Sequence, residues 1–234
     1  MYYCTYVRVS TLFSGGKDST FSIYKAIENG HDVVCLTTMH PVQDDSLLFH
    51  YPNSWLTPYL AEAMQIPTIG FTIRGRSKED EFNALDKAIG QVKSIYDIQG
   101  VVHGGIYSRF QKKIFEQICL KHELASLAPL WNVPLPDYLY DLIDNKFHIK
   151  IIGVSTMGLD KDWLGKSLDR DSIVVLERLS KKYGFNLAFE GGEAETLTID
   201  CPLFKKKLDI RKANIRWDGQ RGMFEILEAV LVPR

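Results

Sequence analysis

The sequence lacks paired cysteines, long apolar runs and an excess of charge of one sign. Its four cysteines, Cys4, Cys35, Cys119 and Cys201, form no CxxC pair, which argues against a zinc ribbon or a redox dithiol. No apolar run reaches the ~18 residues of a membrane span, and the first ten residues have the composition of a strand rather than of a signal peptide. A cytoplasmic protein without membrane contact is therefore expected.

The charge balance excludes a strongly basic nucleic-acid binder. Lys and Arg number 28 and Asp and Glu 29, for a net charge of -1, so the chain as a whole offers no electrostatic footprint for a phosphate backbone. We therefore expect no direct nucleic-acid partner. The 234 residues, 45% of them hydrophobic, provide enough core for one large domain or two small ones.

The first half of the chain alternates short apolar runs with amphipathic stretches. The patterns predict strands at 6–13, 32–39, 67–73 and 101–103, and helices at 20–29, 55–65, 77–96 and 108–123. Such alternation predicts a Rossmann-like α/β fold, in which helices cover both faces of a parallel sheet. Ligands of these sheets bind beyond the carboxyl ends of the strands, where the glycine-rich segments after the first and fourth predicted strands fall.

The second half has a different character. The segment 130–136 contains two prolines and marks a boundary, so we predict an ATP-binding domain at 1–128 and a smaller α+β substrate domain at 129–234. Helices are predicted at 136–145 and 171–183, and a loop at 157–169. Strands are predicted at 146–155, 186–189, 196–200, 207–216 and 223–232, with a hairpin turn at Asp218-Gly219.

The segment 14–19, SGGKDS, follows a predicted strand and precedes a helix. Two glycines let backbone N–H groups approach a ligand, and the start of the helix adds its positive dipole end. Lysine, hydroxyl and carboxylate groups complete a phosphate cradle. The loop is not a Walker A motif, which has the pattern GxxxxGK[ST]. Its members are Ser14, Gly15, Gly16, Lys17, Asp18 and Ser19.

A second polar motif is EGGEAET at 190–196. Three carboxylates, Glu190, Glu193 and Glu195, surround the glycines Gly191 and Gly192. A hydrophobic core has no use for clustered acids, whereas a cation, an amine or Mg²⁺ does. The glycines permit a ligand to approach the backbone closely.

SGGKDS resembles the loop of the ATP pyrophosphatase superfamily, whose members cleave ATP between the α and β phosphates. More specifically, the sequence resembles the diphthine–ammonia ligase (diphthamide synthetase) family over nearly its whole length. The likeness includes SGGKDS, HGGIYSRFQ, GLDKDWLGKSLD and EGGEAETLTIDCPLF, the last being the hallmark of the family.

The resemblance implies the amidation of diphthine, a modified histidine of translation elongation factor 2, with ATP and Mg²⁺. Lys17 and Asp18 would act on the phosphates, with Asp18 as a Mg²⁺ ligand. Glu190, Glu193 and Glu195 would contact the trimethylammonium group, deprotonate ammonium or hold Mg²⁺. The remaining implied positions are Thr37, Thr38, Met39, Gly104 and Gly105 for ATP, and His50, Asn53, Ser108, Gln111, Gly191, Gly192 and Thr196 for the substrate.

Three other functions stay open at this point. A tRNA-modifying enzyme of the same superfamily would also adenylate an oxygen, and a nucleotide sensor would bind ATP without releasing pyrophosphate. A paralogue could amidate another carboxylate, because Ala194 stands where an aromatic residue is common in the family. Tyr2 stands where a glutaminase module would place a cysteine, so free ammonium is the expected nitrogen donor. The residues leave the oligomeric state open, a homodimer included.

Overall fold

The structure is a computed structural model that describes residues 7–42, 53–75 and 77–234. The chain divides into two compact units. Two short segments are grouped with the second unit although their neighbours in the sequence belong to the first. The first unit contains Met1–Ser14, Asp18–Glu62 and Ile66–Trp131, and the second contains Gly15–Lys17, Ala63–Gln65 and Asn132–Arg234. The domain boundary at residues 128/129 stays a prediction.

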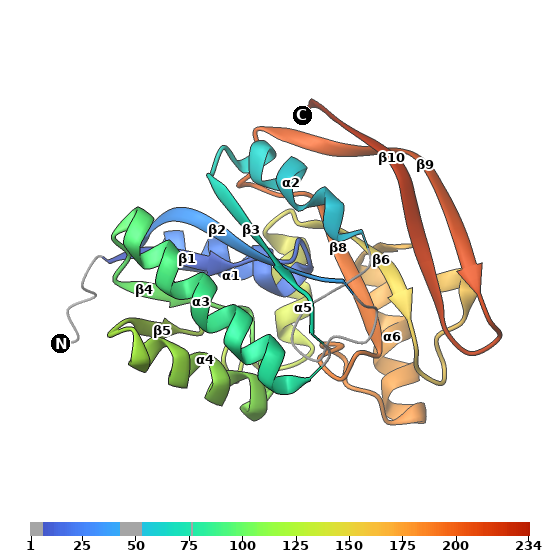
Figure 1. The fold of residues 1–234 in the computed structure, drawn as a ribbon. Coiled ribbons are helices and arrows are strands. Elements are labelled where there is room, and N and C mark those ends of the chain that lie inside the picture. Colours follow the sequence, from blue (N-terminus) through green and yellow to red (C-terminus); the bar gives the residue numbers. More distant parts are fainter. Residues whose placement is uncertain (1–6, 43–52, 76) are drawn as a thin grey trace. The chain divides into compact units, whose positions relative to one another are not determined.

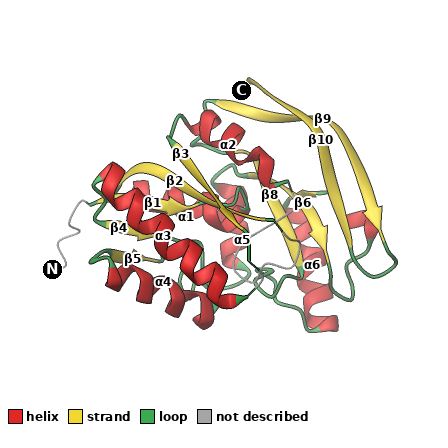
Figure 2. Cartoon of the chain, in the orientation of Figure 1, coloured by secondary structure: helices red, strands yellow, loops and turns green. Residues whose placement is uncertain are grey.

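The first unit is built on a five-stranded parallel sheet (Figures 1 and 2). The order of its strands is β3-β2-β1-β4-β5. The elements are β1 (Arg8–Leu12), α1 (Lys17–Glu28), β2 (Asp32–Pro41), the 3-10 helix η1 (Ser54–Leu56), α2 (Thr57–Met64), β3 (Thr68–Ile73), α3 (Lys78–Tyr96), β4 (Gly100–Val102), α4 (Arg109–Lys121) and β5 (Ala125–Leu127). The prediction of a Rossmann-like parallel sheet is confirmed.

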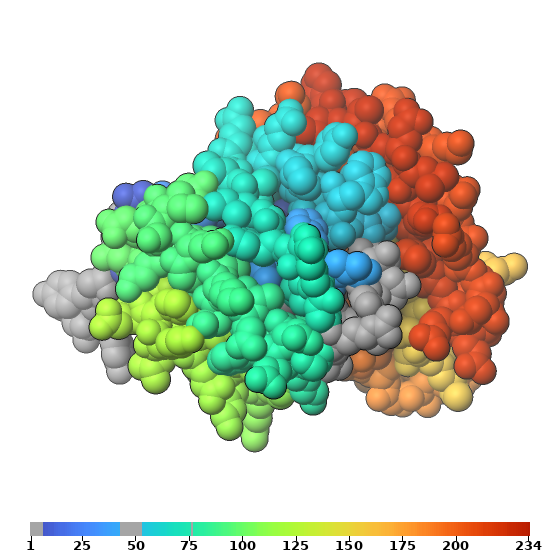
Figure 3. All heavy atoms as spheres, in the orientation of Figure 1, coloured from blue at the N-terminus to red at the C-terminus, as the bar shows by residue number. Residues whose placement is uncertain are grey.

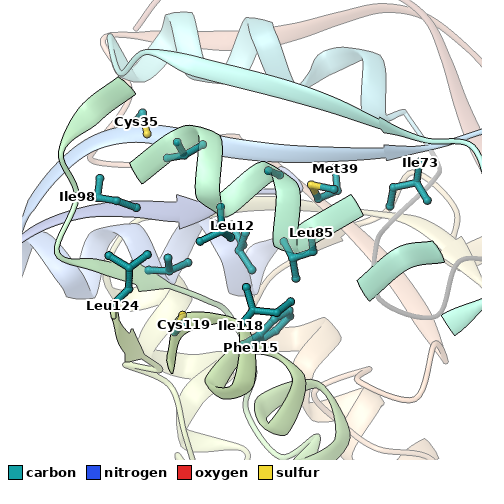
Figure 4. Close-up of a cluster of buried hydrophobic side chains, with 14 residues drawn as sticks. Leu12, Cys35, Met39, Ile73, Leu85, Ile98, Phe115, Ile118, Cys119 and Leu124 are labelled. Atoms are coloured by element: carbon teal, nitrogen blue, oxygen red, sulfur yellow. The ribbon is translucent and has the colours of Figure 1, made fainter. Parts of the chain in front are cut away.

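Helices cover both faces of this sheet because neighbouring strand residues point in opposite directions. On β4, Val101 joins a cluster with Leu85 of α3 and Ile118 of α4, shown in Figure 4. Its neighbour Val102 joins a separate cluster with Ala26 of α1. Two layers of apolar side chains therefore hold the sheet between α3 and α4 on one face and α1 on the other (Figure 1).

Two features of the first unit differ from the predictions. Helix α1 begins at Lys17 rather than at residue 20, so the glycine loop before it is shorter than expected. The strand β5 has three residues and pairs with β4, and its short sequence ASL carries no periodic signal. Pairing with a neighbouring strand, rather than local pattern, makes this segment a strand.

The second unit contains a sheet with the strand order β7-β6-β10-β9, and β8 also pairs with β6. Its elements are α5 (Asp137–Asp144), β6 (His148–Val154), the 3-10 helix η2 (Lys161–Trp163), β7 (Ser167–Leu168), α6 (Arg170–Tyr183), β8 (Ala194–Asp200), β9 (Lys206–Trp217) and β10 (Gly222–Pro233). Gly184 ends α6 in the left-handed conformation, as its position after the apolar pattern predicts.

Two predictions for the second unit are wrong. The segment 186–189 is not a strand but a turn, and Phe189 adopts a positive φ of 66° within it. The predicted loop at 157–169 contains η2 and the two-residue strand β7. In both places the outcome depends on contacts with distant residues, which a local pattern does not contain.

The antiparallel hairpin β9–β10 ends the chain, and its atoms are red in Figure 3. Strand β9 lies at the edge of its sheet. Lysines and arginines are a common protection of edge strands against pairing with other chains. The exposed basic residues of this strand are Lys206, Lys207, Arg211, Lys212 and Arg216. Within the described residues, no helix is long and apolar enough to cross a lipid bilayer.

The start of α3 is fixed by a reciprocal pair of hydrogen bonds. The Ser77 hydroxyl accepts from the Asp80 backbone N–H at 3.0 Å, and the Asp80 carboxylate accepts from the Ser77 N–H at 3.0 Å. A serine followed three residues later by an acidic residue at the start of a helix predicts such a capping box, and the structure confirms it.

Replacing Ser77 by Ala removes one half of this cap and should lower the free energy of unfolding by about 1 kcal/mol. Urea unfolding followed by circular dichroism measures the change. Ser94→Ala is the matched control, because Ser94 is exposed inside the same helix and its replacement should be neutral or slightly stabilising. Equal stability of the S77A variant and the wild type would contradict the assigned role of the cap.

Candidate active site

The predicted phosphate loop connects β1 to α1. Within the first unit, the Ser19 hydroxyl lies 3.3 Å from the Ser14 N–H, which donates to it, and 3.1 Å from the Ser14 hydroxyl. The Ser22 hydroxyl donates to the carbonyl of Asp18 at 2.8 Å. These bonds fix the first turn of α1, whose N–H groups form an anion-binding end.

The end of β4 lies against this first turn. A Cβ atom on Gly104 would stand 2.9 Å from the carbonyl carbon of Asp18 and 2.9 Å from the backbone nitrogen of Ser19. Both neighbours are backbone, which cannot move aside. Glycine is therefore required at 104, where the segment after β4 lies against Asp18 and Ser19 of α1.

His103 is a residue of this edge that sequence reasoning missed. Its side chain is buried, and its Nδ1 accepts from the Gly105 N–H at 3.3 Å. Burial lowers the pKa of His103 to about 4, so the ring is neutral at physiological pH. Its Nε2 has no hydrogen-bond partner in the described part of the chain. The signal that could have found it is a histidine directly after an apolar strand and before two glycines.

The three β2 residues assigned to adenine are buried. The Thr37 hydroxyl lies 2.7 Å from that of Ser10, and Met39 packs in the apolar cluster of α3 and α4. The hydroxyls of Thr38 and Thr11 have no hydrogen-bond partner among the described residues. Buried hydroxyls usually find a partner, so these two mark a place where a water or a ligand group would be stabilised.

In the second unit, β8 holds the backbone of Gly15–Lys17. The Thr198 N–H donates to the Gly15 carbonyl at 2.9 Å, and the Thr196 hydroxyl accepts from the Lys17 N–H at 3.2 Å. Gly15 has a φ of 82°, a value that glycine adopts without strain. The structure thus brings together Gly15, Lys17 and Thr196, which belong to the two motifs that the sequence singled out.

The Lys17 side chain is 1% exposed. Its ammonium donates to the Ala188 carbonyl at 2.6 Å. It also lies 5.4 Å from the centre of the Phe189 ring and 6.0 Å from that of Tyr138. Aromatic faces and a carbonyl dipole compensate part of the cost of removing a positive charge from water.

The carboxylate of Glu193 organises the turn before β8. One of its oxygens accepts from the Asn186 N–H at 2.9 Å and the other from the Gly191 N–H at 2.8 Å. The Asn186 side-chain oxygen accepts in turn from the Ala188 N–H at 2.8 Å. Ser155 binds the same turn, since its hydroxyl donates to the Gly192 carbonyl and its N–H to the Glu193 carbonyl. Sequence reasoning missed Asn186 and Ser155.

The other two glutamates of the motif are partly exposed. Glu195 lies on β8 opposite Gly153 of β6, where a Cβ atom would stand 3.0 Å from the Cβ of Glu195. Glu190 lies in the turn. No group of three or more His, Cys, Asp or Glu side chains that could hold a metal occurs in residues 7–42, 53–75 and 77–234. A Mg²⁺ ion at Asp18 would therefore take its other ligands from phosphates and water, which is its usual preference.

The remaining predicted positions lie on helix starts. Ser108 caps α4, where its hydroxyl accepts from the Gln111 N–H at 3.4 Å. Asn53 is buried and precedes η1 with a φ of 58°. His50 lies outside the described residues.

The fold and the loop together define an α/β protein with a phosphate loop of the ATP pyrophosphatase type. Models of the diphthamide synthase N-terminal domain and C-terminal domain match residues 7–126 and 135–232. The human diphthine–ammonia ligase is 36% identical over 227 residues, 89% of this chain and 85% of that protein. The rat enzyme of the same name is 39% identical over 220 residues, 86% of this chain and 82% of its own.

The chain belongs to the diphthine–ammonia ligase family. Among solved structures, a predicted subunit of a tRNA methyltransferase from Methanocaldococcus jannaschii aligns with 80% of this chain and 95% of its own. It is 17% identical with a TM-score of 0.42, a similarity too weak to carry an inference.

The buried neutral His103 predicts a loss of stability in mild acid. The pKa of His103 is about 4 in the folded chain, against 6.5 for an exposed histidine. Below ~pH 6.5 the unfolded chain therefore binds a proton that the folded chain does not, and this favours the unfolded state. Between ~pH 7.5 and ~pH 5 this site should lower the free energy of unfolding by about 2 kcal/mol. Urea unfolding at several pH values measures the slope.

His103→Gln removes the titration while its carbonyl can still accept from the Gly105 N–H, so the dependence on pH should flatten. His148→Gln, at an exposed histidine, is the matched control and should keep the wild-type slope. The same slope in H103Q and the wild type would show that another group causes the acid sensitivity.

Proposed function

We propose that this chain catalyses the ATP-dependent amidation of diphthine on translation elongation factor 2, with ammonium as the nitrogen donor. The observation that supports this most is its family membership, since the diphthamide synthase models match most of the chain in both units. The local geometry adds a helix start that suits phosphates and a carboxylate-rich turn that suits a cation. The proposed substrate works in translation, which makes the cytoplasm the proposed compartment.

The proposed reaction has two steps that balance in atoms and charge. In the first, the diphthine carboxylate attacks the α-phosphorus of ATP, the bond to the bridging oxygen breaks, and pyrophosphate leaves. In the second, ammonia attacks the acyl carbon of the adenylate, AMP leaves with the bonding electron pair, and a proton is released. Ammonium must lose one proton before it can attack, so a general base near the acyl carbon is required.

The groups of the first unit would bind the leaving pyrophosphate. N–H groups at the start of α1 and the hydroxyls of Ser14 and Ser19 provide donors, and the close approach of Gly104 keeps side chains out of this region. Thr37, Thr38, Met39 and Gly105 are the groups proposed for the adenosine. Mg²⁺, bound by phosphates and Asp18, would supply positive charge to the leaving group.

Groups of the second unit have proposed roles of their own. Lys17 adds a positive charge for the phosphates, and Glu190 and Glu195 are the carboxylates proposed for the trimethylammonium group or the incoming ammonium. Thr196 binds the loop backbone next to Lys17. His50, Asn53, Ser108 and Gln111 remain proposed substrate contacts.

The test is a pyrophosphate-release assay with the purified chain, Mg-ATP and ammonium, with and without elongation factor 2 that carries diphthine. We expect pyrophosphate and AMP only with the factor, and mass spectrometry should show OH replaced by NH₂ on the modified histidine. Release that does not depend on the factor would indicate a small-molecule carboxylate instead. Binding of ATP without release would indicate a nucleotide sensor.

Replacing Lys17 by Met should lower kcat at least ~100-fold, because a preorganised charge at the phosphates is lost. Lys25→Met is the matched control: Lys25 lies on the same helix, where it pairs with Glu28 at 2.8 Å, and this change should leave kcat unaltered. Thermal unfolding of both variants establishes that they are folded. Turnover of K17M at the wild-type rate would remove Lys17 from the mechanism.

A further inference from the structure

A continuous set of hydrogen bonds leads from the carboxylate of Glu193 to the ammonium of Lys17. Glu193 binds the N–H of Asn186, the Asn186 side chain binds the N–H of Ala188, and the carbonyl of Ala188 binds Lys17. We propose that Asn186 and Glu193 are positioning residues, which shape the turn 186–193 so that the Ala188 carbonyl fixes the Lys17 side chain. Its consequence for catalysis rests on the proposed function.

The contacts of Glu193 are those of a structural carboxylate. Its two oxygens are directed at two N–H groups of its own turn, at 2.9 Å and 2.8 Å. Hydrogen bonds from backbone N–H groups to an ionised carboxylate are among the stronger ones in proteins. A group held in this way acts through the shape of the backbone, and it needs no contact with the reacting atoms.

The turn needs this support because its backbone is strained. Phe189 has a φ of 66°, which is unfavourable for a residue with a bulky side chain. Such a conformation persists only where the surroundings impose it. Bonds from Asn186, Glu193 and Ser155 all end on this turn, and the Phe189 ring is buried beside the Lys17 ammonium.

The position of Lys17 depends on the turn because its ammonium is removed from solvent. At 1% exposure, a charge is tolerated only where fixed dipoles replace water. The Ala188 carbonyl supplies one such dipole at 2.6 Å. If the peptide after Ala188 rotates, this acceptor turns away from the ammonium, and the lysine side chain loses one of the contacts that hold it.

The test measures the reactivity of Lys17 directly, in the full chain without any substrate. Limited acetylation with acetic anhydride, followed by mass spectrometry of peptides, gives the rate at Lys17, with the exposed Lys182 as internal reference. Asn186→Ala and Glu193→Gln should each raise the relative rate at Lys17 about tenfold, the factor expected for the loss of one charge-assisted hydrogen bond. Thermal unfolding establishes that each variant is folded.

Asn186→Asp keeps an oxygen for the Ala188 N–H and should restore the slow rate, which a general loss of stability would not. Glu228→Gln, at an exposed glutamate on β10 of the same unit, is the control and should match the wild type. Acetylation of Lys17 at the wild-type rate in both N186A and E193Q would overturn the proposal, and this outcome does not depend on the identity of the enzyme's substrate.

The pyrophosphate assay then tests the catalytic consequence separately. We expect N186A to lower kcat/KM for ATP about tenfold. N186D should recover most of this loss, because it keeps a side-chain oxygen that accepts from the Ala188 N–H, which N186A lacks. Fast labelling of Lys17 in a chain that releases no pyrophosphate would support the positioning role and reject the proposed function. Wild-type labelling with abolished turnover in E193Q would make Glu193 a catalytic group and reject the positioning role.

Discussion

The conformation of Gly15–Lys17 depends on two hydrogen bonds from β8. Thr198 donates to the carbonyl of Gly15, and Thr196 accepts from the N–H of Lys17. These bonds fix the backbone on both sides of Gly16, so Gly15, with its positive φ, and Lys17, which carries the ammonium, are held by the same strand. The conformation of residues 15–17 therefore depends in part on a strand that lies far away in the sequence.

This constraint changes the meaning of the second motif. The run of glutamates and glycines suggests a cluster of acids facing a ligand, but the contacts divide the acids into different roles. All three are partly exposed, and the carboxylate of Glu193 accepts from two backbone N–H groups of its own turn. A motif can be specific to one family because its turn must have one shape, and not only because each of its side chains meets the substrate.

The sequence predicted the parts of the fold whose signals are local. The cap at Ser77, the end of α6 at Gly184 and the hairpin turn at Asp218 each depend on residues a few positions apart, and all three are present. The segment 186–189, Asn-Leu-Ala-Phe, is predicted as a short strand. It is a turn because Glu193 and Asn186 bind its N–H groups, and no propensity of the segment itself reports those bonds.

The same limit applies to the candidate site. The glycines and Lys17 could be found because their pattern is contiguous, and Gly104 because it directly follows a strand. The contact between the Lys17 ammonium and the Ala188 carbonyl spans 171 residues of sequence, and that between the Lys17 N–H and Thr196 spans 179. An exposed fraction of only 1% for a lysine in a glycine-rich loop could not be expected from composition, since lysine is rarely buried.

The grouping of Gly15–Lys17 with the second unit has a consequence for the order in which the protein is made. A ribosome synthesises these three residues long before their partners on β8, since 179 residues separate Lys17 from Thr196. The sheet of the first unit needs no residue beyond Leu127, so its strands can pair while synthesis continues. The second unit must then recruit a segment that was made long before, and contacts of such long range form slowly. The loop that carries the lysine is thus synthesised well before it can reach its final conformation.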